Sequence, residues 1–141
     1  MTVRIARIST EPIALDEHLA AVADSTAGAE CTFVGRVRDH DPDAAGAVAA
    51  LEYTAHPDAA STLHALAERA VGDRSAIVAV SHRVGRLDVG EPAVIIAVAS
   101  SHRAESFEVC RALIEAIKAE LPVWKRQIET DGTTEWKGLG G

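Results

Sequence analysis

Cysteines, aromatic residues and long apolar runs are scarce in this sequence of 141 residues. Its two cysteines, Cys31 and Cys110, each lie in an apolar segment without a CxxC or other paired spacing, so we expect reduced, buried and inert thiols. Because aromatic residues make up only 4%, the core should consist of Val, Ile, Leu and Ala. No apolar run approaches the ~18 residues that span a membrane, and residues 1–12 lack the apolar stretch of a signal peptide. We therefore expect a soluble, cytoplasmic protein.

Several motifs that mark common catalytic sites are also missing. The six histidines form no HExxH or HxxxH pair and no cluster with a cysteine, so we expect no metal site. The glycine loops GxxxxGK(S/T) and GxGxxG, which bind nucleotide phosphates, do not occur. A GxSxG elbow for a serine nucleophile does not occur either. The sequence therefore predicts no cofactor.

The sequence also has no excess of positive charge. The chain has 14 Lys+Arg against 21 Asp+Glu, a formal net charge of −7. This balance argues against nucleic acid or an anionic membrane as a general partner. Residues 102–126 differ from this acidic average, because they include five basic and four acidic residues. We expect this segment to contact an anion.

The order of apolar patterns predicts an α+β fold of one domain over residues 1–141, with a mixed or antiparallel sheet and about three helices. Strands are expected at residues 3–8, 29–38, 48–54, 76–84, 93–100 and 123–129. Helices are expected from the cap Asp16 to the stop Gly28, over residues 57–71, and from Ser101 to the stop Pro122. Residues 85–92 should form a turn between two central strands.

Three finer expectations concern the connections. The strand at 48–54 should pair with residues 31–38 as a hairpin, across a mobile surface loop at 39–46. Residues 123–129 should return as an edge strand. Trp136 should lie in a short closing segment.

The expected long helix is amphipathic. With Phe107 as the reference direction, its apolar stripe contains Cys110, Ile114, Ile117 and Leu121. Lys118 lies on the border of this stripe, where apolar surface would partly desolvate its ammonium and lower its pKa. The neutral amine would then be available as a base or nucleophile. Alternatively, Lys118 keeps its charge in water and lays only its methylenes on apolar neighbours.

Basic residues flank this helix and occur on one strand. They are Arg36, Arg38, His102, Arg103, Lys118, Lys125 and Arg126. Arginine binds phosphate or carboxylate through two parallel hydrogen bonds, and a helix N-terminus adds partial positive charge near His102. Together these residues predict an oxyanion pocket.

Each of them also has a structural alternative. Arg36 and Arg38 can form a solvated strand face. His102 can cap the helix, and Lys125 can be an edge-strand charge that prevents aggregation.

Five blocks of the sequence, in order, resemble the large, catalytic subunit of molybdopterin synthase. They are FVGRVRDH at 33–40, LEYTAHP at 51–57, SHRVGRLDVGE at 81–91, SSHRAESFEVC at 100–110 and IKAELPVWKRQ at 117–127. The resemblance implies an α/β-hammerhead fold and a homodimer that binds two small ubiquitin-like sulfur-carrier subunits as a heterotetramer. It implies sulfur transfer from the carrier's C-terminal Gly-Gly thiocarboxylate to cyclic pyranopterin monophosphate. The product is the dithiolene of molybdopterin, in molybdenum cofactor biosynthesis, and no metal takes part in this step.

The resemblance also implies roles for individual residues. Lys118 matches the essential catalytic lysine and Lys125 the second active-site lysine. The substrate-binding positions are Phe33, Arg36, Val37, Arg38, His102, Arg103, Arg126 and Gln127 in addition to these lysines. In the family, the His-Arg pair reaches a substrate that is bound mainly by the other protomer.

Two features depart from the family pattern. Gln127 stands where the family usually has Glu. The chain ends in Gly140-Gly141, like the carrier, which we interpret as a flexible terminal tail.

Two other functions remain possible from the sequence. One is a non-catalytic paralogue that binds a phosphorylated pterin or another anionic metabolite. The other is an interaction scaffold whose apolar surfaces serve only dimerisation.

Overall fold

The computed structural model describes residues 2–40, 47–132 and 134–139. In chain order the elements are β1 Val3–Ser9, α1 Leu15–Val22, β2 Ala29–Arg36, β3 Val48–Ala55, α2 Ala59–Val71, β4 Ala76–Arg83, β5 Gly85–Asp88, β6 Pro92–Ser100, α3 Arg103–Glu120, β7 Val123–Glu129 and β8 Thr134–Gly138. The expected α+β fold with three helices is confirmed over these residues. None of these helices is long and apolar enough to cross a membrane.

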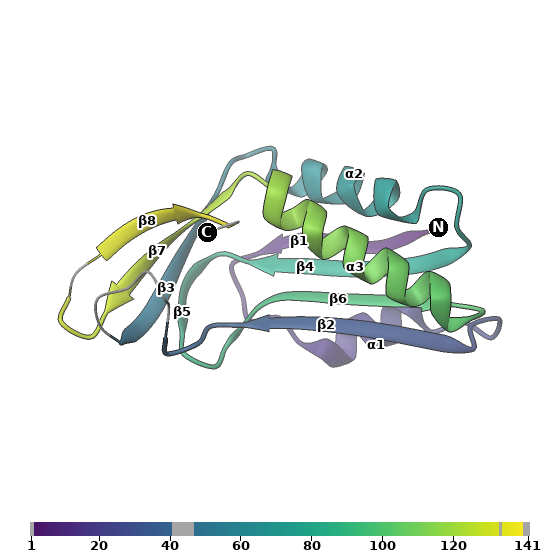
Figure 1. The fold of residues 1–141 in the computed structure, drawn as a ribbon, viewed down its shortest axis with the longest axis horizontal. Coiled ribbons are helices and arrows are strands. Elements are labelled where there is room, and N and C mark those ends of the chain that lie inside the picture. Colours follow the sequence, from purple (N-terminus) through teal and green to yellow (C-terminus); the bar gives the residue numbers. More distant parts are fainter. Residues whose placement is uncertain (1, 41–46, 133, 140–141) are drawn as a thin grey trace.

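The first sheet is mixed and has the order β1-β4-β6-β2 (Figure 1). β1 runs parallel to β4, and the other pairs are antiparallel. Every residue of β6 from Ala93 to Ser100 is buried. A strand that is covered on both faces has a continuous apolar run instead of an alternation, and this run identified β4 and β6 in the sequence. Their expected central position is confirmed.

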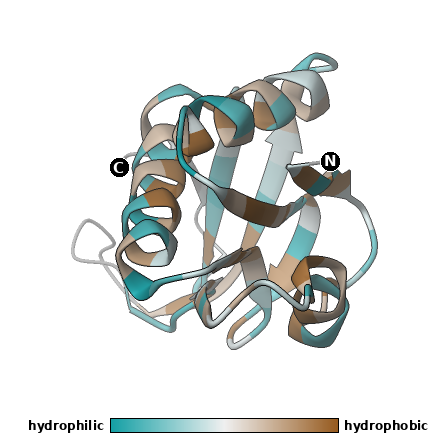
Figure 2. Ribbon diagram, turned by 90° about the vertical axis from the view of Figure 1, so that its right-hand side faces the viewer, coloured by the Kyte–Doolittle hydropathy of each residue, from teal (hydrophilic) through white to brown (hydrophobic). Residues whose placement is uncertain are grey.

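Helices cover both faces of the first sheet (Figure 2). On one face, Val94, Ile96 and Val98 of β6 belong to the main core, together with residues of α2 and α3. On the other face, Ala97 and Ala99 pack near Val22 of α1 in a smaller cluster. Alternate residues of the same strand therefore pack against two separate helix layers.

The second sheet is antiparallel, has the order β5-β3-β7-β8, and lies at one end of the first sheet (Figure 1). The hairpin expected between residues 31–38 and 48–54 is wrong, because β2 pairs with β6 whereas β3 pairs with β5 and β7. Cys31 and Phe33 pack against the main core, which places β2 in the first sheet. Most of the expected loop, residues 41–46, lies outside the described residues.

Two other expectations about the second sheet are also wrong. The turn expected at 85–92 begins with strand β5, whose Leu87 is fully buried opposite Leu51 of β3. The chain turns tightly only afterwards, where the Glu91 N–H donates to the Asp88 carbonyl oxygen. β7 is not an edge strand, because β8, the closing segment that contains Trp136, pairs with its other side.

α3 ends before Pro122, as expected. Its buried face is rotated from the expected stripe toward Val109 and Leu113, because the helix contacts α2 as well as β2 and β6. Phe107 is therefore 61% exposed and Ile114 is only half-buried. The other stripe residues are buried, namely Cys110, Ile117 and Leu121.

α1 differs from its expected bounds, whereas α2 begins at Ala59 instead of Pro57 and ends at Val71 as expected. α1 ends at Val22, well before Gly28, and Asp16 lies in its first turn while Ala14 occupies the N-cap position. α2 ends where Gly72 adopts a φ of 54°, a conformation that favours glycine.

Both cysteines are free thiols. Cys110 is buried as expected, whereas Cys31 is only half-buried. Burial, and then the neighbouring Cys31 thiol, raise the pKa of Cys110 to about 12. Because the thiolate is the reactive form, Cys110 is inert at neutral pH.

Candidate active site

A polar pocket of about 280 Å³ opens where the two sheets meet the C-terminal end of α3. It contains four residues of the predicted oxyanion pocket, namely Arg36, Arg38, Lys118 and Lys125, together with Gln127, which the resemblance added to the site. The rest of its described wall consists of His40, Val48, Leu51 and Tyr53. The fold thus brings four separate segments of the chain together around one concentration of positive charge.

The end of α3 before Pro122 places the two lysines in this pocket. α3 ends there and β7 follows, held by a hydrogen bond of 3.0 Å from the His56 N–H to the Pro122 carbonyl oxygen. Lys125 lies opposite Tyr53 of β3. Because side chains alternate along a strand, Lys125 and Gln127 both face the pocket.

Lys118 has a perturbed ammonium group. Desolvation by the surrounding atoms lowers its pKa, and the positive charge of Arg38 lowers it further. Lys118 lines the pocket although the residue as a whole is exposed. Of the two interpretations that the sequence left open, this geometry favours the desolvated lysine over one whose charge stays in water.

The turn after β5 holds the arginine segment in place. The Val37 N–H donates to the Glu91 carbonyl oxygen at 3.0 Å, and its own carbonyl oxygen accepts the Gly90 N–H at 2.7 Å. The Arg36 Nη1 donates to the Gly90 carbonyl oxygen at 2.9 Å. Val37 itself is 2% exposed and belongs to the main core, so it contributes its backbone here. Arg38 makes no hydrogen bond or ion pair with another described residue, and it lines the pocket.

Arg126 lies on the opposite face of β7. Its Nη2 donates to Glu52 at 2.9 Å, and its guanidinium lies 5.4 Å from the centre of the Trp136 ring. The structure therefore does not bring Arg126 to the pocket with Lys125.

Three further residues of the expected site lie elsewhere in the chain. Phe33 is half-buried and packs against the main core instead of lining the pocket. His102 and Arg103 are exposed at the start of α3. At 1.5 Å per residue, Arg103 lies about 22 Å along the helix from Lys118, so one chain cannot bring them together.

Comparison with known proteins now identifies the family. The family model described as "MoaE protein" matches residues 8–120. The chain belongs to the MoaE protein family. It is 40% identical over 137 residues to "Molybdopterin synthase catalytic subunit 1" of Mycobacterium tuberculosis, a match that covers 94% of this chain and 89% of that protein.

Other MoaE relatives agree with this assignment. The "Molybdopterin synthase catalytic subunit" of Halalkalibacterium halodurans is 36% identical over 140 residues, covering 98% of this chain and 88% of that protein. The crystal structure of molybdopterin synthase from Staphylococcus aureus superposes with a TM-score of 0.85 at 32% identity, covering 93% of this chain and 95% of that one. The resemblance noted in the sequence is thus confirmed.

Sequence reasoning missed two residues beside the lysines of this MoaE protein. Tyr53 lines the main pocket, and a smaller cavity of about 60 Å³ adjoins it, lined by Tyr53 and His82 among others. Burial raises the pKa of Tyr53 to about 12. Burial also lowers the pKa of His82 to about 4, with a smaller contribution from the charge of Lys118. The available signal was a tyrosine and a histidine within two strands that are otherwise largely apolar.

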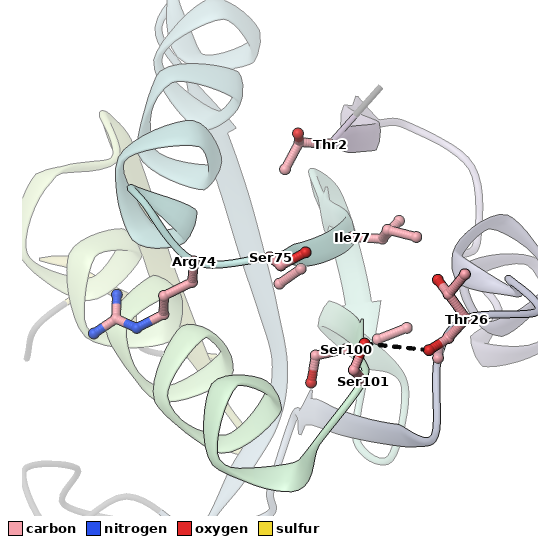
Figure 3. A pocket seen from close by; sticks show the side chains of 10 residues that line it. Thr2, Thr26, Arg74, Ser75, Ile77, Ser100 and Ser101 are labelled. Atoms are coloured by element: carbon pink, nitrogen blue, oxygen red, sulfur yellow. Dashed lines mark hydrogen bonds between the residues drawn. The ribbon is translucent and has the colours of Figure 1, made fainter.

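A different cavity of about 320 Å³ lies at the far end of the MoaE protein, beside the start of α3 (Figure 3). Its polar wall consists mainly of hydroxyl groups, including those of Thr26, Ser100 and Ser101. Arg74 lies at its edge, but its side chain turns toward α3, where Nε donates to Glu108 at 3.1 Å. With this charge paired, the cavity suits an oxyanion less well than the lysine pocket does.

Proposed function

We propose that this MoaE protein is the catalytic subunit of a molybdopterin synthase. It transfers sulfur from the C-terminal thiocarboxylate of a small ubiquitin-like carrier to cyclic pyranopterin monophosphate, and two transfers form the dithiolene. The observation that carries the proposal is the desolvated Lys118 in one pocket with Lys125 and Arg38. Such a pocket combines an available amine with cations for a phosphate and a thiocarboxylate.

Each residue has a chemical role in this proposal. Arg36 and Arg38 hold the phosphate and neutralise the charge that develops as the cyclic ester opens. Lys125 stabilises the thiocarboxylate and the tetrahedral oxyanion. Lys118, with its lowered pKa, transfers protons or briefly accepts the carrier's acyl group.

We propose that a second copy of the chain completes each site. His102 and Arg103 are cations at the exposed start of α3, and Phe107 beside them is 61% exposed. An exposed aromatic residue next to cations is typical of a protein interface. In a homodimer this end of α3 reaches the partner's pocket, and two carrier subunits then form the heterotetramer.

We propose the cytoplasm as the location and residues 1–141 as one functional domain. Both cysteines are free although they are neighbours, which fits a reducing compartment. The main core contains residues of both sheets, such as Val98 and Leu51, which fits one folding unit.

A non-catalytic paralogue that binds a phosphorylated pterin is the second candidate. It would need Arg36 and Arg38 but neither a desolvated amine nor a carrier. The lowered pKa of Lys118 favours the enzyme.

The experiment that tests the proposal supplies thiocarboxylated carrier and cyclic pyranopterin monophosphate to the Lys118→Ala protein. We expect the yield of dithiolene to fall by at least about 100-fold, as for loss of a general acid or base. Arg111→Ala is the matched control, because it removes another exposed cation of α3 that does not line the pocket. A near-normal dithiolene yield with Lys118→Ala would overturn the assignment.

A further inference from the structure

The small cavity of about 60 Å³ adjoins the main pocket, with which it shares Arg36, Tyr53, Lys118 and Lys125. Much of its remaining wall is apolar, including Ala93, Val94, Ile114 and Ile117. His82 is the one uncharged imidazole in its described wall. We refer to this space as the inner cavity.

The structure defines which ring nitrogen of His82 can accept a hydrogen bond from a ligand. Its Nδ1 lies 2.8 Å from the Arg83 carbonyl oxygen, and because a carbonyl can only accept, Nδ1 carries the proton. The Tyr53 ring meets the imidazole edge to face at 5.1 Å and 73°, which fixes its orientation. Within the described residues, Nε2 makes no hydrogen bond, and His82 lines the inner cavity.

His82 is also neutral at physiological pH. It is only 3% exposed, and burial keeps its pKa at about 4, with a smaller contribution from Lys118. The charged groups around the cavity, namely Arg36, Lys118 and Lys125, are all cations that oppose its protonation. At physiological pH His82 therefore remains a hydrogen-bond acceptor, and the cationic side chains around it are donors.

The size of the inner cavity selects its occupant. About 60 Å³ is too small for a pterin or a peptide end but has room for about two water molecules, each of which takes roughly 30 Å³. A buried water needs two to four polar partners, and this wall offers His82, Lys118 and Lys125. The cavity is therefore suited to ordered water next to the catalytic amines.

The proposed sulfur transfer, on which this inference rests, requires such a water. When the thiocarboxylate sulfur bonds to a carbon of the pterin side chain, the carbon-oxygen bond at that carbon breaks and its electrons leave with the oxygen. The carrier's acyl group is then a thioester. Hydrolysis forms a bond from the water oxygen to the acyl carbon and breaks the carbon-sulfur bond. The bonding electrons stay on sulfur, and one proton of the water passes to a neighbouring neutral amine. The second proton of the water passes from the new carboxylic acid to the sulfur, so the products are the carrier carboxylate and the pterin thiol.

We propose that the inner cavity supplies this hydrolytic water and that His82 orients it by accepting a hydrogen bond at Nε2. His82 acts in the second half of each transfer, after the carbon-sulfur bond to the pterin has formed. Its loss should therefore slow release of the carrier but not formation of the thioester.

The test compares His82→Leu, which has no acceptor, with His82→Gln, which retains one, in single turnovers followed by intact mass of the carrier. With His82→Leu, we expect the carrier-pterin thioester to accumulate and to decay about tenfold more slowly, the worth of one hydrogen bond. Hydroxylamine, which cleaves thioesters without the water site, should release the trapped carrier as its hydroxamate. His82→Gln should restore most of the rate, which a purely structural role of His82 would not explain.

A second variant keeps the test independent of the stability of His82→Leu. Ala93→Val adds two methyl groups to the wall of the inner cavity and leaves His82 in place, so it should also trap the thioester. Thioester decay at the wild-type rate in Ala93→Val and in folded His82→Leu would overturn the inference. Failure of the wild-type protein to consume thiocarboxylate would instead refute the proposed function itself.

Discussion

The buried neutral His82 makes a quantitative prediction about stability in acid. The pKa of its imidazole falls from 6.5 to about 4 on folding, so between these values the unfolded chain binds a proton that the folded chain excludes. The His82 contribution to stability is therefore complete above pH 6.5, decreases as the pH falls toward 4, and is constant below that. Between pH 7 and pH 5 the loss amounts to about 2 kcal/mol.

The perturbation that isolates this effect is His82→Gln, which cannot titrate. Urea denaturation at pH 7 and pH 5 gives the free energy of unfolding of both proteins. The wild type should lose about 2 kcal/mol more than the variant over this interval. His18, which is also buried with a lowered pKa, contributes equally to both proteins and cancels. Equal losses would refute the conclusion that His82 is held neutral in the fold.

Three further predictions follow from the site and the core. Arg38→Gln removes a charge that lowers the pKa of Lys118, so labelling of Lys118 by an amine-acylating reagent should begin at a higher pH, and an unchanged profile would contradict this electrostatic account. Leu113→Ala should reduce the free energy of unfolding by about 2–5 kcal/mol in urea denaturation, because Leu113 is fully buried where α3 meets the main core, and a loss below about 1 kcal/mol would contradict that packing. Mixing inactive His102→Ala and Lys118→Ala proteins should restore up to about a quarter of the wild-type activity, because half of the randomly formed dimers contain one intact site, whereas no recovery would refute a shared site.

The sequence predicted those parts of the fold that depend on local pattern. The continuous apolar runs of β4 and β6 and the Pro122 stop of α3 were recognisable because they reflect burial and backbone geometry of neighbouring residues. Pairing between distant strands was not recognisable. Residues 31–38 and 48–54 are adjacent in sequence but belong to different sheets, since their apolar sides are buried against different partners.

The direction of the buried face of α3 likewise depends on contacts with distant parts of the chain. A helical wheel gives the angle between side chains but not the position of the neighbouring elements. The contact of α3 with α2 brings Val109 into the core and leaves Phe107 in solvent. Only the tertiary structure decides between these two faces.

In the candidate site, the cations were predicted better than their neutral neighbours. Lys118, Lys125 and Arg38 stand out because charge is rare in apolar surroundings. His82 did not stand out, since a single histidine in an apolar strand is usually a structural residue. Arg126 was assigned to the pocket because of its position next to Lys125, although alternation along β7 directs it to the other face.

The most direct test of the central claim measures sulfur transfer by the protein itself. Wild-type protein, thiocarboxylated carrier and cyclic pyranopterin monophosphate are combined, and mass spectrometry follows the exchange of sulfur for oxygen in the carrier together with the dithiolene product. The account predicts that two carriers lose sulfur for each pterin converted, and that Lys118→Ala abolishes both signals while Arg111→Ala retains them. Carrier that keeps its sulfur with the wild-type protein, or loses it equally fast with Lys118→Ala, would contradict the account.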